Sequence, residues 1–425
     1  MSLILSTLCR THAERKPPEG FLPIESPLKA SLNQYYEPWE TITANLPALI
    51  SGRVIRDSVD CMPILSVLHL QAEPEWRRAY VLLTFMLHGY IWGCPNPVEI
   101  IPPPLAIPLL EVSAHVELPP IATFAGLCLW NYKVIDADRS PADPENLRTG
   151  FTFTGTDDEK WFYLISVAIE ADGARVVSLM TDLISASQRQ DRLAVTKGLD
   201  LLSKAISHVR SLLQRMYERC DPHVFYHHLR PFLNGTKNAA HAGLPLGIIY
   251  NDGTGLQGYT QYRGGSNAQS SLIQLFDIVL GVEHSSAERA FLLEMRDYMP
   301  GPHRRFLERI PPHANMREFV RNNPCDEELN AAYARAVCML RSLRNAHLRI
   351  VSRYIIVESK KAGPASCYIC NSQKNITDSL EYSKDLYLDR SRQDNSRKRG
   401  GPLRGTGGTP LVQFLKRLRD DTSYH

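Results

Sequence analysis

The stretch that decides the fold runs from Asn323 to Glu358 and reads NPCDEELNAAYARAVCMLRSLRNAHLRIVSRYIIVE. Its apolar residues recur at steps of three and four, the period of a helix with one buried face. They are Leu329, Tyr333, Ala336, Val337, Leu340, Leu343, Ile350, Val351 and Tyr354, and His347 shares their face. The pattern predicts one long helix that carries a histidine toward the protein interior.

The start of this helix is also marked in the sequence. Asn323 can cap it, Pro324 suits the first helical position, and three acidic residues follow at 326–328, where they favour the positive end of the helix dipole. A buried imidazole must either find a hydrogen-bond partner or bind a ligand. From periodicity alone a paired core histidine is the more common outcome, so a ligand role for His347 needs other evidence.

Composition excludes several classes of function. The chain has 425 residues, 44% of them hydrophobic and 22% charged, which is typical of a soluble globular protein with two or three domains. A net charge of +3 is too small to indicate nucleic acid or an anionic membrane as partner. We find neither an apolar run of about 18 residues nor a secretory signal. We therefore expect a monomer without a nucleic-acid or membrane partner.

The cysteines indicate a reducing compartment, and we expect a cytoplasmic protein. There are nine of them, an odd and scattered set that does not form a disulfide framework. The only close pair, Cys367 with Cys370, lacks the further ligands of a zinc site, so loop thiols are the better interpretation. No CxxCH motif occurs, so any haem would be held without covalent attachment.

The predicted fold class is mainly α, with a small N-terminal α-rich domain at residues 1–101 and a large helical domain at 119–425. The centre of the small domain, Trp76 to Gly93, is an apolar helix. Nearby His69 and His88 could be haem ligands, but a core role is the better interpretation. Residues 102–118 contain four prolines, which we expect to preclude a regular helix and to form an extended connector.

The large domain is predicted to hold several long helices. A short strand or bend at 151–153 precedes a helix that runs to about Ser185, and an amphipathic helix covers 191–218. Residues 359–404 are polar and poor in aliphatic side chains, which indicates a mobile loop. Its basic run at 397–399 is short and mixed with acids, so a solvated loop is a better interpretation than a nuclear signal or a nucleic-acid patch.

Two groups of residues could form a pocket. Phe162 and Ser166 are four apart and share a helix face, although a core aromatic beside a helix-bonded serine explains them equally. Phe225, Tyr226 and Arg230 come just before Pro231, which disfavours helical geometry at Arg230. An aromatic wall beside an arginine would suit an aromatic amino acid, whereas a surface arginine is the simpler alternative. We assign no role to His227 and His228.

Two further segments carry helix-start signals. Ser266 and Gln269 have the spacing of a capping box before the apolar run that follows, and such a helix start could bind a carboxylate or propionate. Near the C-terminal end, Thr409 can cap a helix with Pro410 in its first position. The glycines before Thr409 lack the lysine of a phosphate-binding loop.

Several blocks resemble the indoleamine 2,3-dioxygenase family, in order and at similar separations. They are SLRNAHLRIVSRYII around His347, GGSNAQSSLIQLFDIVLG from Gly264, MRDYMPGPHRRFL from Met295 and GTGGTPLVQFLKRLRD from Gly405, with further matches at Leu118 to Tyr132 and Phe225 to Gly235. The resemblance covers most of the chain and suggests a fungal-type member. It implies that haem b, ferrous in the active state, acts with dioxygen to cleave the indole C2–C3 bond of L-tryptophan. The product would be N-formylkynurenine, the first intermediate of the kynurenine pathway.

The resemblance also implies roles for single residues. His347 would be the proximal ligand of the haem iron. Phe162 and Ser166 would line the oxygen side, and the haem would also contact Ser266, Arg344 and Phe124. Phe225, Tyr226, Arg230 and Thr406 would bind the substrate, with Arg230 on its carboxylate.

In related enzymes the aspartate that matches Asp277 approaches the arginine that matches Arg344. Phe124 stands where a tyrosine is common in the family. Thr236 stands where the family pattern has an aromatic residue. The competing hypotheses are a haem or indole sensor of the same fold without efficient turnover, and a helical interaction scaffold without haem.

Overall fold

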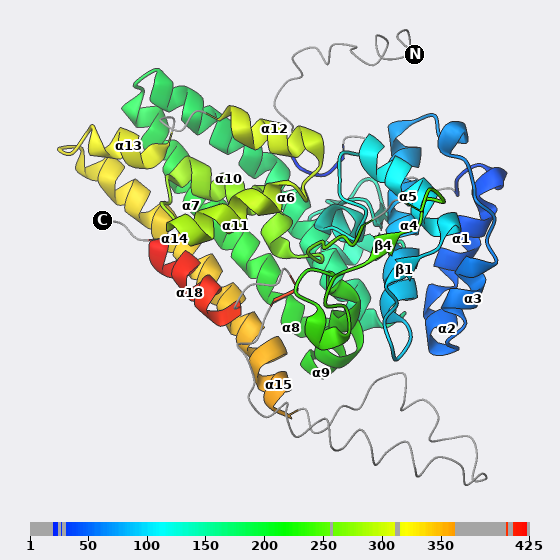
Figure 1. Ribbon diagram of the computed structural model, residues 1–425. Coiled ribbons are helices and arrows are strands. Elements are labelled where there is room, and N and C mark those ends of the chain that lie inside the picture. The colour runs from blue at the N-terminus through cyan, green and yellow to red at the C-terminus, as the bar shows by residue number, and fades with distance from the viewer. Residues whose placement is uncertain are drawn as a thin grey trace.

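The computed structural model describes residues 20–23, 27, 31–255, 258–310, 315–361, 405–406 and 411–422. Within these residues the protein is mainly α, as predicted, and its strands form only two small two-stranded sheets. Of the loop predicted at 359–404, residues 359–361 are helical, and residues 362–404, with Cys367, Cys370 and the basic run, lie outside the described residues. The predicted cap at Thr409 and Pro410 also lies outside them. Figure 1 shows the N-terminal helices gathered on one side and the later helices on the other.

The N-terminal region is built around one buried helix. It comprises α1 (Glu37–Ala44), α2 (Leu46–Ser51), α3 (Ile55–Asp60), α4 (Glu73–Trp92) and α5 (Pro103–His115), with short 3-10 turns at Gln34–Tyr36 and Val67–His69. Helix α4 is buried from Ala79 to Ile91, and α1, α3 and α5 pack against it. The apolar helix predicted at Trp76 to Gly93 is therefore confirmed as the centre of this region.

Of the two histidines for which a core role was predicted, His88 has that role and His69 does not. His88 is fully buried; its Nδ1 lies 2.6 Å from the Phe232 carbonyl oxygen, and its Nε2 lies 3.1 Å from the Ala122 backbone nitrogen, from which it accepts a hydrogen bond. Burial lowers the pKa of His88 to about 4, so the ring is neutral. His69 is exposed and its ring lies beside that of Tyr35.

The expectation of an extended connector at residues 102–118 is wrong, because helix α5 occupies Pro103 to His115. Pro103 and Pro104 stand in the first turn, where backbone N–H groups have no partner within the helix and proline costs no hydrogen bond. Pro108 removes one such bond. Burial of Leu105, Leu109 and Val112 offsets that loss, which proline counting alone could not predict.

Both sheets join segments that are distant or irregular. Strand β1 (Ile100–Ile101) pairs in parallel with β4 (Ile249–Tyr250), with Ile100 opposite Ile249. Strand β2 (Tyr132–Val134) is antiparallel to β3 (Leu147–Thr149), with Tyr132 opposite Thr149. No strand forms at the predicted 151–153; instead the backbone nitrogens of Phe153 and Thr154 donate to the carboxylate of Glu159.

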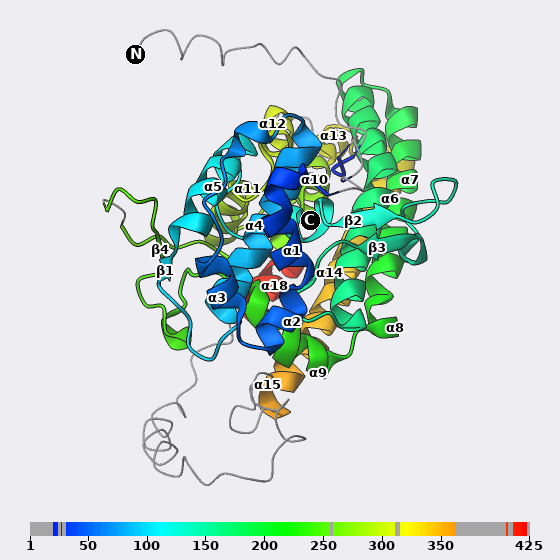
Figure 2. The ribbon, with the colours of Figure 1, turned by 90° about the vertical axis from the view of Figure 1, so that its right-hand side faces the viewer.

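Three long helices form the frame of the larger region. They are α6 (Asp157–Gln188), α7 (Arg192–Gln214) and α14 (Glu327–Val351), and α7 packs against both of the others. Figures 1 and 2 both show α6 and α7 side by side. Every apolar residue predicted to form the buried stripe of α14 and its extension is buried. The helix begins later than predicted, however, because Asp326 caps it in place of Asn323.

The long helix continues past α14 with altered hydrogen bonding. A π-helical segment, η9 (Ser352–Val357), leads into α15 (Glu358–Lys361). Another interruption follows α7, where the chain runs through α8 (Met216–Arg219), α9 (Pro222–Val224), the π-helical η5 (Phe225–Leu229) and the 3-10 helix η6 (Arg230–Leu233). Pro231 does not prevent helical geometry at Arg230, whose φ of −53° and ψ of −35° are helical, so that expectation is wrong.

The remaining helices cover the frame. They are α10 (Ser271–Leu280), α11 (Ser286–Arg296), α12 (Gly301–Arg309), α13 (Met316–Arg321) and α18 (Leu411–Asp421), with short helical turns at Ala125–Leu129 (η3), Pro144–Asn146, Ala240–Ala242 and Asn267–Gln269 (η8). Helix α18 lies along α14 (Figure 1). Gly173 lets α10 approach α6, since a Cβ there would lie 2.8 Å from Leu272 Cδ2.

The capping box predicted from Ser266 and Gln269 is not formed. The Ser266 hydroxyl accepts from the Ala268 nitrogen at the start of η8, and α10 is capped by Ser270, whose hydroxyl accepts from the Ile273 nitrogen. Gln269 instead joins two loops: its side chain accepts a hydrogen bond from Phe124 N and donates one to Gly264 O.

The buried core has two parts. One extends from Leu32 to Phe414 and includes the N-terminal helices, and the other fills the space between α6, α7, α10, α13 and α14. The division of the chain near residues 101–119 remains a prediction, and the first core cluster contains residues from both sides of it. No helix in the described ranges is both long and apolar enough to cross a bilayer.

Candidate active site

A cavity of about 270 Å³ lies where the long helices meet the interrupted segments. Its walls come from α6, α7, α10, α14 and α18, from η3, η5 and η6, and from the loops at 265–270 and 405–406. Most of the lining side chains are apolar. The structure brings together in this cavity all of the predicted site residues except Tyr226, namely Phe124, Phe162, Ser166, Phe225, Arg230, Ser266, Arg344, His347 and Thr406.

His347 is the candidate metal ligand on α14. It lines the cavity, and within the described part of the chain neither ring nitrogen has a hydrogen-bond partner. Burial lowers the pKa of His347 to about 4, so the imidazole is neutral at physiological pH and keeps a lone pair for a ligand. The alternative of a paired core histidine therefore has no support among these residues.

Aromatic side chains form another part of the cavity wall. The ring centroids of Phe162 and Phe225 are 5.1 Å apart, and Phe225 meets Tyr354 edge to face at 5.7 Å. Phe225 is held by η5, whose π-helical turn follows a helix start capped by Asp221. This arrangement offers flat apolar surfaces of the kind that pack against an aromatic ring.

Arg230 supplies a cation to this aromatic part of the cavity. It follows Phe225 by five residues, and burial lowers the pKa of its guanidinium, which nevertheless stays charged at any physiological pH. Tyr226 does not line the cavity; its ring centroid lies 5.4 Å from the guanidinium carbon of Arg230. Tyr226 therefore supports the arginine from outside the cavity rather than facing it.

Ser166 is not placed as a base. Its hydroxyl donates to the Phe162 carbonyl oxygen at 3.3 Å, one turn back on α6. A hydroxyl bonded to its own helix has no partner that would take up its proton. Ser166 and Phe162 therefore shape this wall of the cavity without offering acid–base chemistry.

Glu170 is a cavity residue that the sequence analysis missed. Its side chain is 1% exposed, one oxygen accepts a hydrogen bond from the Ser270 hydroxyl, and the other has no partner among the described residues. Burial raises the pKa of Glu170 to about 7. The signal was present in the spacing, because Phe162, Ser166 and Glu170 are successive fourth residues of one helix.

The loop at Gly405 and Thr406 is tied to the loop at Gly264 and Gly265. The Thr406 hydroxyl donates to the Gly265 carbonyl oxygen at 2.9 Å, and the Gly264 nitrogen donates to the Thr406 carbonyl oxygen at 3.3 Å. Both loops line the cavity together with Ser266. Two segments about 140 residues apart in sequence thus close one side of the site.

Arg344 binds protein groups and lies at the centre of a network that holds α18. Its guanidinium pairs with Asp277 of α10, as the resemblance implied, and donates to the Leu418 carbonyl and the Thr422 hydroxyl. His284 contacts Asp277 and Asp421, at 3.1 and 3.2 Å. Arg344 therefore fixes helices around the cavity, since its guanidinium joins α14 to α10 and α18.

The two departures from the family pattern have different locations. Phe124 lines the cavity, so it can change the cavity shape. Thr236 is buried but does not line the cavity, and its hydroxyl accepts a hydrogen bond from the Tyr262 nitrogen at 2.9 Å. A threonine at 236 therefore acts through loop packing.

These residues fit a haem group. A neutral histidine with no hydrogen-bond partner among the described residues faces an apolar cavity, which suits a ligand of haem iron. Arg230, Ser266 and the paired Arg344 are among the polar residues of the lining. The donor set does not suit a hydrated or oxygen-ligated metal, because among the described lining residues the carboxylates are the buried Glu170 and the ion-paired Asp277.

Comparison with known proteins agrees with this geometry. The family model described as indoleamine 2,3-dioxygenase matches residues 15–425. An indoleamine 2,3-dioxygenase of Penicillium citrinum is 39% identical over 95% of this chain and 85% of its own length. A 6-hydroxytryptophan 2,3-dioxygenase of Fusarium equiseti is 37% identical over 95% and 94%. An indoleamine 2,3-dioxygenase of Saccharomyces cerevisiae is 37% identical over 96% and 91%. The chain therefore belongs to the indoleamine 2,3-dioxygenase family.

Proposed function

We propose that this protein is a haem-dependent dioxygenase that cleaves the indole C2–C3 bond of L-tryptophan to give N-formylkynurenine. The observation that carries the proposal is the neutral imidazole of His347, which has no hydrogen-bond partner in the described part of the chain, at an apolar cavity whose wall also holds Phe225 and Arg230. Haem b, when bound through His347, would supply the activation of dioxygen. The protein would supply binding, orientation and exclusion of water.

Substrate orientation is the main task of the side chains. Phe162 and Phe225 would pack against the indole ring, and Arg230 would pair with the amino-acid carboxylate through two parallel hydrogen bonds. The loop at Thr406 would cover the bound amino acid, held in place by its hydrogen bonds to the loop at Gly264 and Gly265. Fixing both ends of the substrate positions one indole bond for reaction.

Ser166, the phenylalanines and Asp277 take no part in proton transfer in this scheme. Ser166 is bonded to its own helix, the phenylalanines carry no protons to transfer, and Asp277 is held in an ion pair with Arg344. The oxidation adds both oxygen atoms of dioxygen to the substrate, so the overall reaction needs neither a leaving group nor an external reductant. We further propose that the haem iron is ferrous in the active state and that the protein is a cytoplasmic monomer.

The experiment is product analysis with the purified, haem-loaded and reduced protein, L-tryptophan and ¹⁸O₂. We expect N-formylkynurenine carrying both labelled atoms from the wild-type protein, and no product from the His347→Ala variant. A normal Soret band without product would contradict tryptophan cleavage and support the sensor hypothesis. An unchanged Soret band in His347→Ala would contradict the ligand assignment. A parallel incubation with 6-hydroxytryptophan, which the name of one relative specifies, tests the substrate class.

A further inference from the structure

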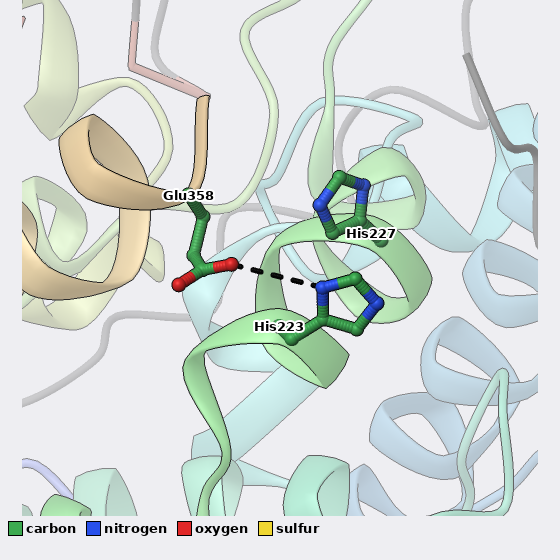
Figure 3. A group of neighbouring side chains, drawn as sticks. All are labelled: His223, His227 and Glu358. Atoms are coloured by element: carbon green, nitrogen blue, oxygen red, sulfur yellow. Dashed lines mark ion pairs between the residues drawn. The ribbon is translucent and has the colours of Figure 1, made fainter. Parts of the chain in front are cut away.

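A second group of possible ligands lies outside the cavity, and we call it the His–His–Glu cluster. It consists of His223, His227 and Glu358, whose nearest ligand atoms all lie within 4.8 Å of one another. Figure 3 shows the three side chains converging, the histidines from one short helical segment and the glutamate from another. His223 Nδ1 lies 3.7 Å from Glu358 Oε2. No role for His227 could be predicted from the sequence, because Glu358 is far from the two histidines in the chain.

The fold fixes this convergence from both sides. His223 stands on α9 and His227 four residues later on η5, so the two share one face. Their ring centroids are 4.4 Å apart. Glu358 is the first residue of α15, which continues the long helix through η9, and both α9 and η5 pack against η9. The Asp221 side chain caps the start of α9 by accepting from the His223 and Val224 nitrogens.

The charge state of the cluster suits a cation. The Glu358 side chain is only 4% exposed, and Lys361 pairs with its Oε1 at 2.8 Å, which leaves Oε2 directed at the histidines. Neither ring nitrogen of His227 has a hydrogen-bond partner within the described residues. A neutral imidazole and a carboxylate oxygen are ordinary zinc ligands.

The distances require only a small adjustment. Zinc with four ligands at about 2.0 to 2.1 Å separates the ligand atoms by roughly 3.3 Å. The observed 3.7 Å between His223 and Glu358 is close to that value. The side chain of His223 is 65% exposed and can rotate without disturbing the core. We propose that the His–His–Glu cluster binds one divalent transition-metal ion, zinc by its ligand set, with the fourth position left to water.

Such an ion would connect η5 and η9, the two segments that carry Phe225 and Tyr354. Phe225 lies between the two histidines in the chain and lines the cavity. Its ring contacts Tyr354 on η9, four residues before Glu358. Zinc at the cluster would therefore fix η5 against η9 and restrain Phe225. The site stands outside the cavity, so metal binding can be tested whether or not the protein cleaves tryptophan.

The test is a calorimetric titration of the untagged, haem-loaded protein with zinc chloride after removal of bound metals. The background carries Cys367→Ser and Cys370→Ser, because two thiolates can take up added zinc even where they do not complete a four-ligand site. We expect one saturable site, and a thermal midpoint that rises with zinc. The His223→Gln, His227→Gln double variant should bind at least about 10-fold more weakly, as even changes outside the ligand shell cost that much. His241→Gln, an exposed histidine elsewhere, should leave both readouts unchanged.

Two results would overturn the proposal. One is the lack of saturable binding at micromolar zinc in the background protein, which would leave an ordinary His–Glu ion pair. The other is equal zinc affinity in the double variant and in His241→Gln. The Soret band and the thermal midpoint without zinc report on folding of each variant, and the single variant His223→Gln, changed only at an exposed side chain, repeats the comparison with minimal risk to the fold.

Discussion

At the scale of single residues, the site combines predictable and unpredictable members. His347 was predictable because helical periodicity placed it on the buried face of α14. Tyr226 was predicted to contact the substrate, yet it lies against Arg230 outside the cavity. Its position depends on the π-helical turn of η5, which alters the helical spacing by one residue. Local spacing therefore could not assign the faces of neighbours in that turn.

Arg230→Ala should weaken tryptophan binding by about 10- to 100-fold, because it removes hydrogen bonds to a charged carboxylate. Haem binding should stay unchanged. Steady-state kinetics with tryptophan and with tryptamine, which lacks the carboxylate, provide the measurement. Wild type should prefer tryptophan, whereas the variant should handle both amines alike. Arg230→Lys should be intermediate, since lysine keeps the charge but not the planar fork. Equal loss of haem and substrate binding would contradict the assignment.

Glu170 should make stability depend on pH in an unusual direction. Its folded pKa of about 7 lies above the unfolded value, so the native state holds the proton more tightly. Stability is therefore lost as pH rises from about 4.5 to 7, by about 3 kcal/mol in total. Glu170→Gln removes this loss. Urea unfolding of haem-free protein should show the variant gaining on wild type between pH 5 and pH 8, and a constant difference would contradict the prediction.

At the scale of elements, sequence patterns predicted long helices better than their interruptions. The stripe of α14 was confirmed because apolar periodicity over many turns leaves little freedom. The prolines of α5 led to a wrong prediction of an extended connector. A proline in the first turn of a helix costs no hydrogen bond, and tertiary burial outweighs the loss of one hydrogen bond at Pro108. The cap of α10 by Ser270 rather than Ser266 reflects Gln269, whose partners come from distant loops.

The attachment of α18 should weaken as pH rises. Burial lowers the pKa of His284, but its pairing with Asp277 and Asp421 outweighs this and raises the pKa overall. A raised folded pKa gives stability that is present below the unfolded value of about 6.5 and lost as pH rises through the folded pKa. The protection of the amides of residues 411–421, measured against the intrinsic exchange rate at each pH, should therefore fall at high pH.

His284→Gln should remove most of that pH dependence and should accelerate exchange most strongly at pH 6. His208 provides the matched control, because it also pairs with an aspartate, Asp172, at 2.9 Å, but its side chain is 49% exposed. Exposed pairs contribute little to stability, so His208→Gln should leave α18 unaffected. Identical exchange profiles for His284→Gln and wild type at both pH values would contradict the role of this network.

At the scale of the whole molecule, the fold class and the predicted residues that line the cavity followed from the sequence. The full set of lining residues did not. Its lining extends from Phe124 to Leu418, and contacts between such distant segments leave no local pattern. The ordered blocks of family resemblance substituted for that missing information. Glu170, His223 and Glu358 belonged to no quoted block of the resemblance, and only the structure placed Glu358 beside His223 and His227.

Haem removal should destabilise the protein as a whole, because the group would fill a cavity lined by all three long helices, α6, α7 and α14. Binding to the native state alone stabilises it by about 3 kcal/mol at a free haem concentration 100 times Kd. Thermal unfolding followed by circular dichroism should give a higher midpoint with haem than without. His347→Ala should lose most of that increment, and an equal increment in the variant would indicate non-specific haem binding.

The wall formed by α18 has a consequence during synthesis on the ribosome. Leu411, Phe414, Leu415 and Leu418 complete the cavity, and Arg344 binds α18 at Leu418 and Thr422. A nascent chain in which α6, α7 and α14 have emerged from the ribosome still lacks this side of the cavity until α18 is translated. Stable binding of a haem group in this cavity would therefore require that residues 411–422 have been translated and packed against α14.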